Sequence, residues 1–451
     1  MTVNDVIQYI LGFGAAIFIP VIIFLLALVV RLKVSSAFRS AILFGVAFTG
    51  MLLVIVSLFY GQIAPAATAM VNRFGLSLDI LDIGWTPAAA IAWAWPAAAS
   101  MFLVQIVINL VMLAFKLTKT LNVDMWNVWQ KAFVGAIVVA ATGNYLIAYL
   151  VAAVWIIFEL KFGDWSAYMV HEYVGVPGIS IPHSASLILM IAGPLDDLLT
   201  RIPGLDKVKA DPKVLREKFG VFGESMILGL IIGILIGILA GYDFQKVLSL
   251  GMASATALML MPMMARLFME ALAPISEAAG EFMKSRFPGR EVLIGLDWPI
   301  LAGNPATYAV GILCIPLLIL FSVILPGNHT LIFGAIADWA WMVSVIGVIT
   351  GANILRMLII SLVAIPAYFY TATYFGAAIT QVAQASAFAM PENATKITWF
   401  GTSPFFMFVM KVVEFNWLSI VWAVALVGLI FWAWKYLTKV NNAAKARLEA
   451  L

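Results

Sequence analysis

Long apolar stretches separated by short charged segments dominate the chain. The first runs from about residue 6 to 30 and the second from about 40 to 62. A helix needs about 20 apolar residues to cross a bilayer, and it satisfies its own backbone hydrogen bonds in lipid. The sequence lacks the alternating segments of about 10 residues that mark membrane barrel strands. The pattern therefore predicts an all-α polytopic membrane protein.

Charges between the apolar stretches indicate how the chain crosses the membrane. The loop after the first span holds Arg31, Lys33 and Arg39, whereas the loop after the second holds one basic residue, Arg73. Basic loops stay in the cytoplasm, so the N-terminus is predicted to be periplasmic. Counting all spans gives about 11 transmembrane helices and a cytoplasmic C-terminus.

Several interruptions break this regular pattern. A fourth span is predicted over about 132–158, interrupted at Thr142-Gly143-Asn144, with a polar outer loop over 159–172. Short apolar pieces with Gly and Pro predict re-entrant hairpins at 77–96 and 291–308. Irregular backbone at membrane depth is tolerated only against protein or a watery cavity, so the breaks indicate a binding site.

The first half of the sequence recurs weakly in the second. Leu81-Asp82-Ile83-Gly84-Trp85 resembles Ile294-Gly295-Leu296-Asp297-Trp298, and Thr142-Gly143-Asn144 resembles Thr350-Gly351-Ala352-Asn353. The separations are about 210 residues, and equivalent loops differ in basic charge, as expected of inverted repeats. We therefore expect a first repeat over 1–200, a cytoplasmic linker over 201–222, a second repeat over 223–415, and a last span with a cytoplasmic tail over 416–451.

Composition narrows the class of protein. Of the 451 residues 64% are hydrophobic and 11% charged, whereas soluble domains carry about 25% charged residues. The single cysteine, Cys314, excludes a disulfide framework, and three dispersed histidines form no metal motif. The sequence shows no phosphate-binding loop and no nucleophile triad. We expect no metal, no cofactor and no nucleic-acid partner.

Polar residues at the interruptions are the candidate substrate-binding groups. Carboxylates and amides exchange hydrogen bonds with hydroxyls, and indoles stack on the C–H faces of polyols. This chemistry suits a neutral polyhydroxylated solute held near the membrane midplane. The candidates are Asp82, Trp85, Thr86, Asn144, His183, Ser184, Asp297, Trp298, Asn304 and Asn353.

These candidates also have structural interpretations. Asp297 is either a ligand for the solute or a helix cap, and His183 is either a ligand donor or a polar pin for its loop. Asn144 and Asn353 either line the site or satisfy broken backbone. An ion-coupled secondary transporter, with a proton or sodium ion on Asp297 or Asp82, is the alternative function. A membrane-embedded enzyme is a weaker one.

Several motifs together resemble one family. The motifs are Asn122-Val123-Asp124-Met125-Trp126-Asn127-Val128-Trp129, Gly163-Asp164-Trp165, Ile181-Pro182-His183, Phe222-Gly223-Glu224 and Ile294-Gly295-Leu296-Asp297. With them the chain resembles the galactitol-type EIIC permeases of the bacterial phosphotransferase system over nearly its whole length.

This resemblance implies a homodimer in the bacterial inner membrane that moves a polyol by an elevator-type motion. It implies that a separate EIIB subunit, phosphorylated on a cysteine by EIIA, phosphorylates the bound substrate. Cys314 is not that cysteine, because it lies inside a span. Thr86 and Asn304 depart from the residues expected for galactitol, so a related hexitol, a pentitol or a sugar stays open.

Overall fold

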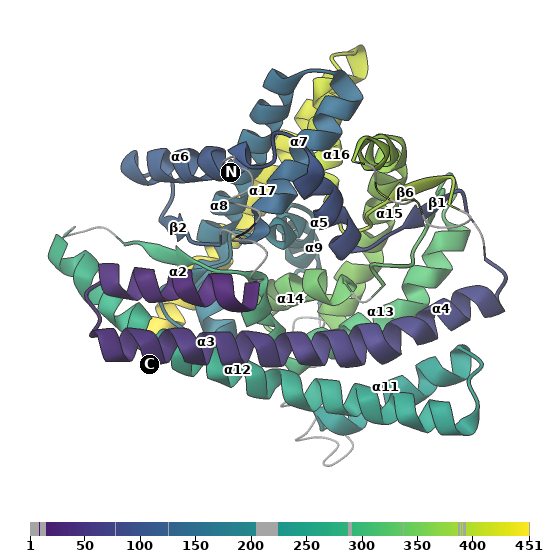
Figure 1. The fold of residues 1–451 in the computed structure, drawn as a ribbon, viewed down its shortest axis with the longest axis horizontal. Helices are drawn as coiled ribbons and strands as arrows, with labels where there is room; N and C mark the ends of the chain where they lie inside the picture. The colour runs from purple at the N-terminus through teal and green to yellow at the C-terminus, as the bar shows by residue number, and fades with distance from the viewer. Residues whose placement is uncertain are drawn as a thin grey trace.

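The computed structural model of the chain is largely helical, as the sequence predicts (Figure 1). It describes residues 9, 15–76, 78–124, 126–203, 224–286, 291–336, 338–386, 388, 390 and 394–450. The linker predicted over 201–222 lies almost wholly outside the described residues.

Helices follow one another in a similar order in the two halves of the chain. The helices of the first half are α2 (Ala15–Val29), α3 (Val34–Val54), η1 (Ile55–Ile63), α4 (Ala64–Arg73), α5 (Trp85–Ala94), α6 (Ser100–Ala114), η2 (Trp126–Val128), α7 (Trp129–Thr142), α8 (Tyr145–Val174), η3 (Ser184–Ile188) and α9 (Leu189–Leu199). Those of the second half are α11 (Ser225–Leu239), α12 (Phe244–Arg286), η5 (Trp298–Gly303), α13 (Pro305–Ile324), α14 (Trp339–Thr350), α15 (Ile354–Ala385) and α16 (Pro404–Val413), and α17 (Trp417–Glu449) follows.

Apolar helices of very different length build the described part of the chain. Among the described residues, four helices, α8, α13, α15 and α17, are long and apolar enough to cross a membrane, and seven further apolar helical segments have 10–17 residues. Large apolar side chains are exposed along α17, among them Ile420, Val424 and Val427. A helix that exposes such a face suits a lipid environment.

The predicted fourth span over 132–158 is wrong, because the chain reverses inside it. α7 ends at Thr142, Gly143 has a φ of 68°, and Asn144 caps α8 by accepting a hydrogen bond from the Ile147 N–H at 3.2 Å. α7 packs against α8, so the two form a helical hairpin. The interruption seen in the sequence at Thr142-Gly143-Asn144 is this turn, and the apolar residues on both sides of it made two antiparallel helices look like one span.

The polar outer loop predicted over 159–172 is also wrong. α8 continues without a break to Val174. Glu159 is buried within this helix and does not mark the end of a span. A charge at the edge of an apolar stretch marks the membrane surface only when nothing buried pairs with it.

Two small parallel sheets correct the all-α prediction. Sheet A has the strand order β5-β1-β6 and sheet B the order β2-β4-β3. Strands this short show no alternating pattern in the sequence. In Figure 1, β2 lies near one end of the molecule, and β1 and β6 lie near the other. The strands are β1 (Ile80–Asp82), β2 (Thr120–Asn122), β3 (Ile179–Ser180), β4 (Leu293–Gly295), β5 (Thr330–Leu331) and β6 (Lys396–Thr398).

Each sheet takes its central strand from one half of the chain and its outer strands from the other. β1 of the first half pairs with β5 and β6, and β4 of the second half pairs with β2 and β3. The segments 77–96 and 291–308, predicted as hairpins, each consist of one of these central strands followed by a short helix, α5 or η5. The two halves are therefore interlocked through their sheets.

The pairing register makes the two sheets directly comparable. Ile80 of β1 pairs with Thr330, and Leu293 of β4 pairs with Thr120. Ile80 and Leu293 are therefore equivalent, and Trp85 is equivalent to Trp298. Asp82 then corresponds to Gly295, not to Asp297 as the sequence comparison suggested.

Candidate functional site

Three buried polar side chains lie together at the carboxyl ends of the strands of sheet B, which we call its inner end. Asp124 follows β2, His183 follows β3 and Asp297 follows β4. One ligand atom from each lies within 4.8 Å of the other two, and all three residues are buried. Parallel strands that end at the same level bring together side chains that are far apart in sequence.

His183 lies at the centre of this group. Its Nε2 lies 3.8 Å from Asp297 Oδ1 and 3.4 Å from the Gln130 amide nitrogen. Its Nδ1 accepts a hydrogen bond from the Ala185 N–H at 3.0 Å. A neutral imidazole that accepts at Nδ1 carries its proton on Nε2, so His183 presents a donor to Asp297.

Asp297 caps the short helix η5. Its Oδ1 accepts a hydrogen bond from the Trp298 N–H at 2.7 Å. Among the described residues, this is the one backbone N–H that donates to its carboxylate, which leaves acceptor positions for other groups. The cap and the ligand interpretations of Asp297 are therefore compatible.

A buried ion pair supports the group from the α7–α8 hairpin. Lys131 Nζ lies 2.7 Å from Glu159 Oε2, and both side chains are 1% exposed. Glu159 Oε1 accepts hydrogen bonds from Ser184 Oγ at 2.9 Å and from Trp155 Nε1 at 2.7 Å. The Ser184 hydroxyl also contacts Gln130 Oε1. The network fixes Ser184 and Gln130 beside His183.

The spacing of Asp124, His183 and Asp297 would bracket a metal ion, but the chemistry does not fit one. The His183 nitrogen that faces the carboxylates carries a proton in the neutral ring, so it has no lone pair for a metal. Donors and acceptors arranged in this way suit hydroxyl groups better.

The polar group lies deep in the molecule. Glu159 is at the middle of α8, about 21 Å along the helix axis from Tyr145 and about 22 Å from Val174. The amino ends of the strands of sheet B carry exposed charges: Lys119 Nζ and Glu291 Oε2 are 2.7 Å apart there. Substrate sites of transporters with inverted repeats lie at this kind of depth.

Asp82 sits in a different environment at the inner end of sheet A. Its carboxylate accepts hydrogen bonds from four backbone N–H groups, and the residue is fully buried. The donors are those of Gly84 (3.3 Å), Phe333 (3.2 Å), Ala335 (2.6 Å) and Phe400 (2.8 Å). Four donors fill the capacity of a carboxylate. Asp82 therefore fastens β1 to the segments that follow β5 and β6.

Three tryptophans connect the inner ends of the two sheets. The Trp341 ring lies 4.8 Å from the Trp298 ring, in a stacked arrangement, and 5.8 Å from the Trp85 ring. The sequence suggests that Trp85 and Trp298 belong to equivalent elements, and Trp341 joins them. Indole rings offer flat apolar faces to a sugar alcohol, and Trp85 and Trp341 are only partly buried.

The remaining sequence candidates lie outside the polar group. Asn144 is exposed at the α7–α8 turn, about 21 Å along α8 from Glu159. Asn353 caps α15 through the Arg356 N–H at 3.0 Å, and Asn304 caps α13 through the Ala306 N–H at 3.0 Å. Thr86 is exposed. The structure thus unites His183, Ser184 and Asp297 and leaves the three asparagines as helix caps.

Sequence reasoning missed five members of the group. Lys131 and Glu159 flank an apolar stretch and were read as its two ends, yet they lie at similar distances from the Gly143 turn. Opposite charges placed in this way around a turn signal are the pattern that would have revealed the pair. The missed residues are Asp124, Asn127, Gln130, Lys131 and Glu159.

Comparison with known proteins identifies the family. A model of the EIIC-GAT family, described as "PTS system sugar-specific permease component", matches residues 9–393. This chain belongs to that family. It is a membrane component of a phosphotransferase system, and such a component works with an EIIB partner on a sugar substrate.

Curated relatives of the EIIC-GAT family agree with this assignment. The "PTS system galactitol-specific EIIC component" of Escherichia coli (strain K12) is 33% identical over 405 residues, which cover 88% of this chain and 90% of the relative. The protein of the same description from Escherichia coli O157:H7 matches equally well. A "Putative permease IIC component" of Escherichia coli (strain K12) is 32% identical over 426 residues, covering 94% of this chain and 96% of the relative.

Proposed function

We propose that this permease component binds and translocates galactitol or a closely related sugar alcohol at the inner end of sheet B. The observation that carries the proposal is the buried polar group around His183 and Asp297. It combines carboxylate acceptors with imidazole and amide donors at mid-depth in the molecule. Similarity to galactitol-specific EIIC components supports a polyol as the substrate.

Individual residues take distinct roles in this proposal. Asp297 and Asp124 accept hydrogen bonds from substrate hydroxyls, and His183 Nε2–H donates one. Ser184 and the Gln130 amide complete the polar lining. Trp298, with Trp341 and Trp85 beyond it, supplies the apolar face on which the carbon chain of the polyol lies. Asp82, Asn144, Asn304 and Asn353 hold the scaffold.

The wider architecture is proposed to be a pair of inverted repeats over 1–200 and 223–415, with about 11 crossings. The same order of helices and strands on both sides, and the exchange of central strands between two sheets, support the repeat. Basic residues on the last helix, among them Lys439, Lys445 and Arg447, support a cytoplasmic C-terminus and, with an odd number of crossings, a periplasmic N-terminus. We place the protein in the bacterial inner membrane, as a homodimer that moves substrate by an elevator-type motion.

The chemistry of phosphorylation belongs to the partner. Cys314 is buried in α13, so a cysteine of EIIB, charged by EIIA, is proposed to donate the phosphoryl group. The substrate oxygen bonds to phosphorus as the sulfur–phosphorus bond breaks, and the hydroxyl proton is released. The basic loop 201–218, which lies mostly outside the described residues, and Glu224 are proposed to face EIIB.

One assay separates this proposal from an ion-coupled transporter. Membrane vesicles that contain the protein receive labelled galactitol with or without phosphorylated EIIB. We expect label to accumulate as galactitol phosphate only with phosphorylated EIIB, and to be indifferent to proton and sodium gradients. Accumulation of free galactitol that collapses with an ion gradient would establish the alternative, an ion-coupled transporter with the ion on Asp297 or Asp82.

A further inference from the structure

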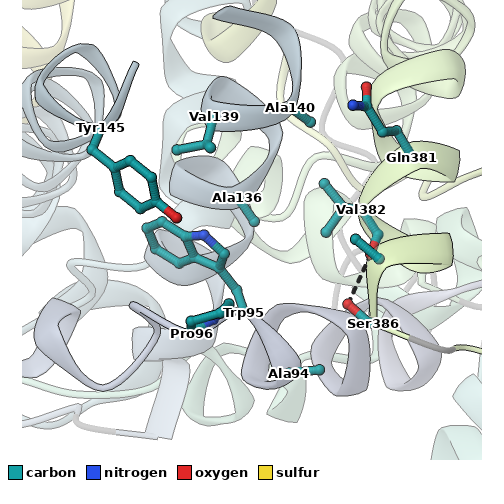
Figure 2. A pocket seen from close by; sticks show the side chains of 11 residues that line it. Ala94, Trp95, Pro96, Ala136, Val139, Ala140, Tyr145, Gln381, Val382 and Ser386 are labelled. Atoms are coloured by element: carbon teal, nitrogen blue, oxygen red, sulfur yellow. Dashed lines mark hydrogen bonds between the residues drawn. The ribbon is translucent and has the colours of Figure 1, made fainter. Parts of the chain in front are cut away.

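A cavity lies toward the other end of α7 from the polar group. It has a volume of about 260 Å³, and its lining includes Trp95, Tyr145, Gln381 and Ser386. Figure 2 shows Trp95 and Tyr145 on one side of this cavity and Gln381 and Ser386, from α15, on the other. The cavity therefore lies between the ends of α5, α7 and α15 and the start of α8.

The lining combines flat rings with hydrogen-bonding groups. The Trp95 and Tyr145 rings are stacked, with centroids 6.1 Å apart. Trp95 is 7% exposed, and its indole N–H has no hydrogen-bond partner in the described part of the chain. Gln381 offers an exposed amide, and the Ser386 hydroxyl donates to the Val382 carbonyl at 2.8 Å, which leaves its oxygen as an acceptor (Figure 2). Aromatic faces with an amide and a hydroxyl oxygen are groups that bind sugar alcohols, whereas an acyl chain would leave the buried Trp95 N–H unpaired.

The cavity and the polar group share the helix α7. Ala136, Val139 and Ala140 line the cavity, and Ala136 is about 9 Å along the helix axis from Gln130. Three buried aromatic rings fill the space beside this part of α7. Trp399 lies 5.0 Å from Trp129 and 5.6 Å from Phe133, measured between ring centroids.

Charges place the cavity on the face away from EIIB. At the far end of α8, Lys445 lies over the Tyr168 ring at 5.2 Å and Arg447 bonds to Glu172 at 2.5 Å. Tyr145 is about 35 Å along α8 from Tyr168, which is enough to span the hydrocarbon core. Basic residues mark the cytoplasmic end, so the cavity faces the periplasm.

We propose that this cavity is an outer subsite, at which the sugar alcohol binds before it passes the Trp129–Phe133–Trp399 rings to the inner polar group. The inference rests on the proposed polyol substrate and adds a place of entry to it. The indole N–H of Trp95 and the Gln381 amide donate to substrate hydroxyls, and the Trp95–Tyr145 pair stacks on its carbon chain.

The test compares entry from outside with phosphorylation from inside. Gln381→Leu and Trp95→Phe each remove one donor, and Gln384→Leu, on the same helix but outside the lining, and Trp93→Phe, stacked on Phe102, are the matched controls. We measure galactitol uptake in right-side-out vesicles, and phosphorylation by phosphorylated EIIB with detergent-solubilised protein, where substrate reaches the inner group from the cytoplasmic face.

We expect KM for uptake to rise three- to tenfold in Gln381→Leu and Trp95→Phe and to stay unchanged in both controls. KM for phosphorylation in detergent should stay within twofold of wild type in all four. An unchanged KM for uptake in Gln381→Leu and Trp95→Phe, or the same rise in the controls, would overturn the outer subsite. An equal rise in both assays would overturn it too, because it would show a general disturbance of the protein. Failure of the wild type to handle galactitol in either assay would instead reject the proposed substrate.

Discussion

The inner ends of sheets A and B have the same backbone plan and opposite chemistry. The pairing register aligns Asp297 with Gly84, Asp124 with Gly334, and His183 with Gly401. In sheet B these three positions carry the buried polar group. In sheet A all three are glycines. The two ends therefore differ at the very positions where side chains would meet.

Close backbone packing explains the glycines of sheet A. A Cβ on Gly334 would lie 2.3 Å from the Ile83 carbonyl carbon, and one on Gly84 would lie 2.8 Å from the Gly334 oxygen. Gly84 also has a φ of 74°, which favours glycine. Backbone atoms fill the inner end of sheet A, and the Asp82 carboxylate accepts hydrogen bonds from four backbone N–H groups there. The comparison shows why, in the function proposed here, sheet A serves the structure and sheet B the binding of substrate.

The largest effect is expected at the buried Lys131–Glu159 ion pair. The sheet A side has no equivalent pair among the described residues, because Trp341 occupies the position that corresponds to Lys131. Lys131→Met leaves the Glu159 carboxylate buried without a counter-charge, which costs about 3–5 kcal/mol. We expect a marked fall in the melting temperature of the detergent-solubilised protein. Lys131→Met combined with Glu159→Gln should recover most of it. A single variant as stable as wild type would contradict the buried pair.

The next two predictions distinguish Asp82 from Asp297 by the effect of each substitution on the free energy of unfolding. Asp82→Asn replaces an acceptor with a donor opposite backbone N–H groups, and we expect a loss of about 2–4 kcal/mol in the free energy of unfolding. The measurement is thermal unfolding in detergent, followed by galactitol binding to the protein that stays folded. Weak galactitol binding by a fully stable Asp82→Asn protein would show that Asp82 belongs to the binding site after all.

Asp297→Asn should give the reverse result. The asparagine oxygen can still cap η5 at the Trp298 N–H, so stability should stay within about 1 kcal/mol of wild type. Loss of charge-assisted hydrogen bonds to substrate should lower galactitol affinity by roughly 10- to 100-fold and abolish uptake at low substrate. Uptake assays and binding titrations check this. Uptake equal to wild type would reduce Asp297 to a helix cap.

The smallest effect is expected at Asn144, which lies at the α7–α8 turn and outside the inner ends of both sheets. Asn144→Ala removes the cap of α8 and should cost about 1 kcal/mol of stability. Galactitol uptake per folded molecule should be unchanged, with Asn353→Ala as the equivalent change in the second half. A tenfold loss of uptake in Asn144→Ala, with stability preserved, would return Asn144 to the list of binding residues.

Much of this arrangement could be predicted from the sequence. The apolar pattern gave the membrane class, the motifs gave the family, and the breaks singled out His183, Ser184 and Asp297, which do lie together. The two sheets could not be predicted, because two or three residues are too few to show a periodicity. Without strand pairing, Asp82 and Asp297 look equivalent, and the two-residue shift between them is invisible.

Missing the α7–α8 hairpin had a similar cause. Hydropathy averages over a window longer than the turn at Gly143, so two apolar helices that reverse direction look like one span. The error separated Lys131 from Glu159 by a membrane thickness. It also hid Asp124 and Gln130, which precede the span predicted over 132–158. Strands far apart in the sequence bring these residues together, so local sequence patterns cannot show that they are neighbours.

The exchange of strands between the halves sets an order for biogenesis. β1 emerges from the ribosome early, but both of its partners belong to the last third of the chain. At about 5–20 residues per second, β1 waits about 15–60 s for β6 to be synthesised. Until the second half has been made, the Asp82 carboxylate has no Phe400 N–H to accept from and sheet A cannot form. A gene cut between the two halves would have to deliver both pieces to the membrane together.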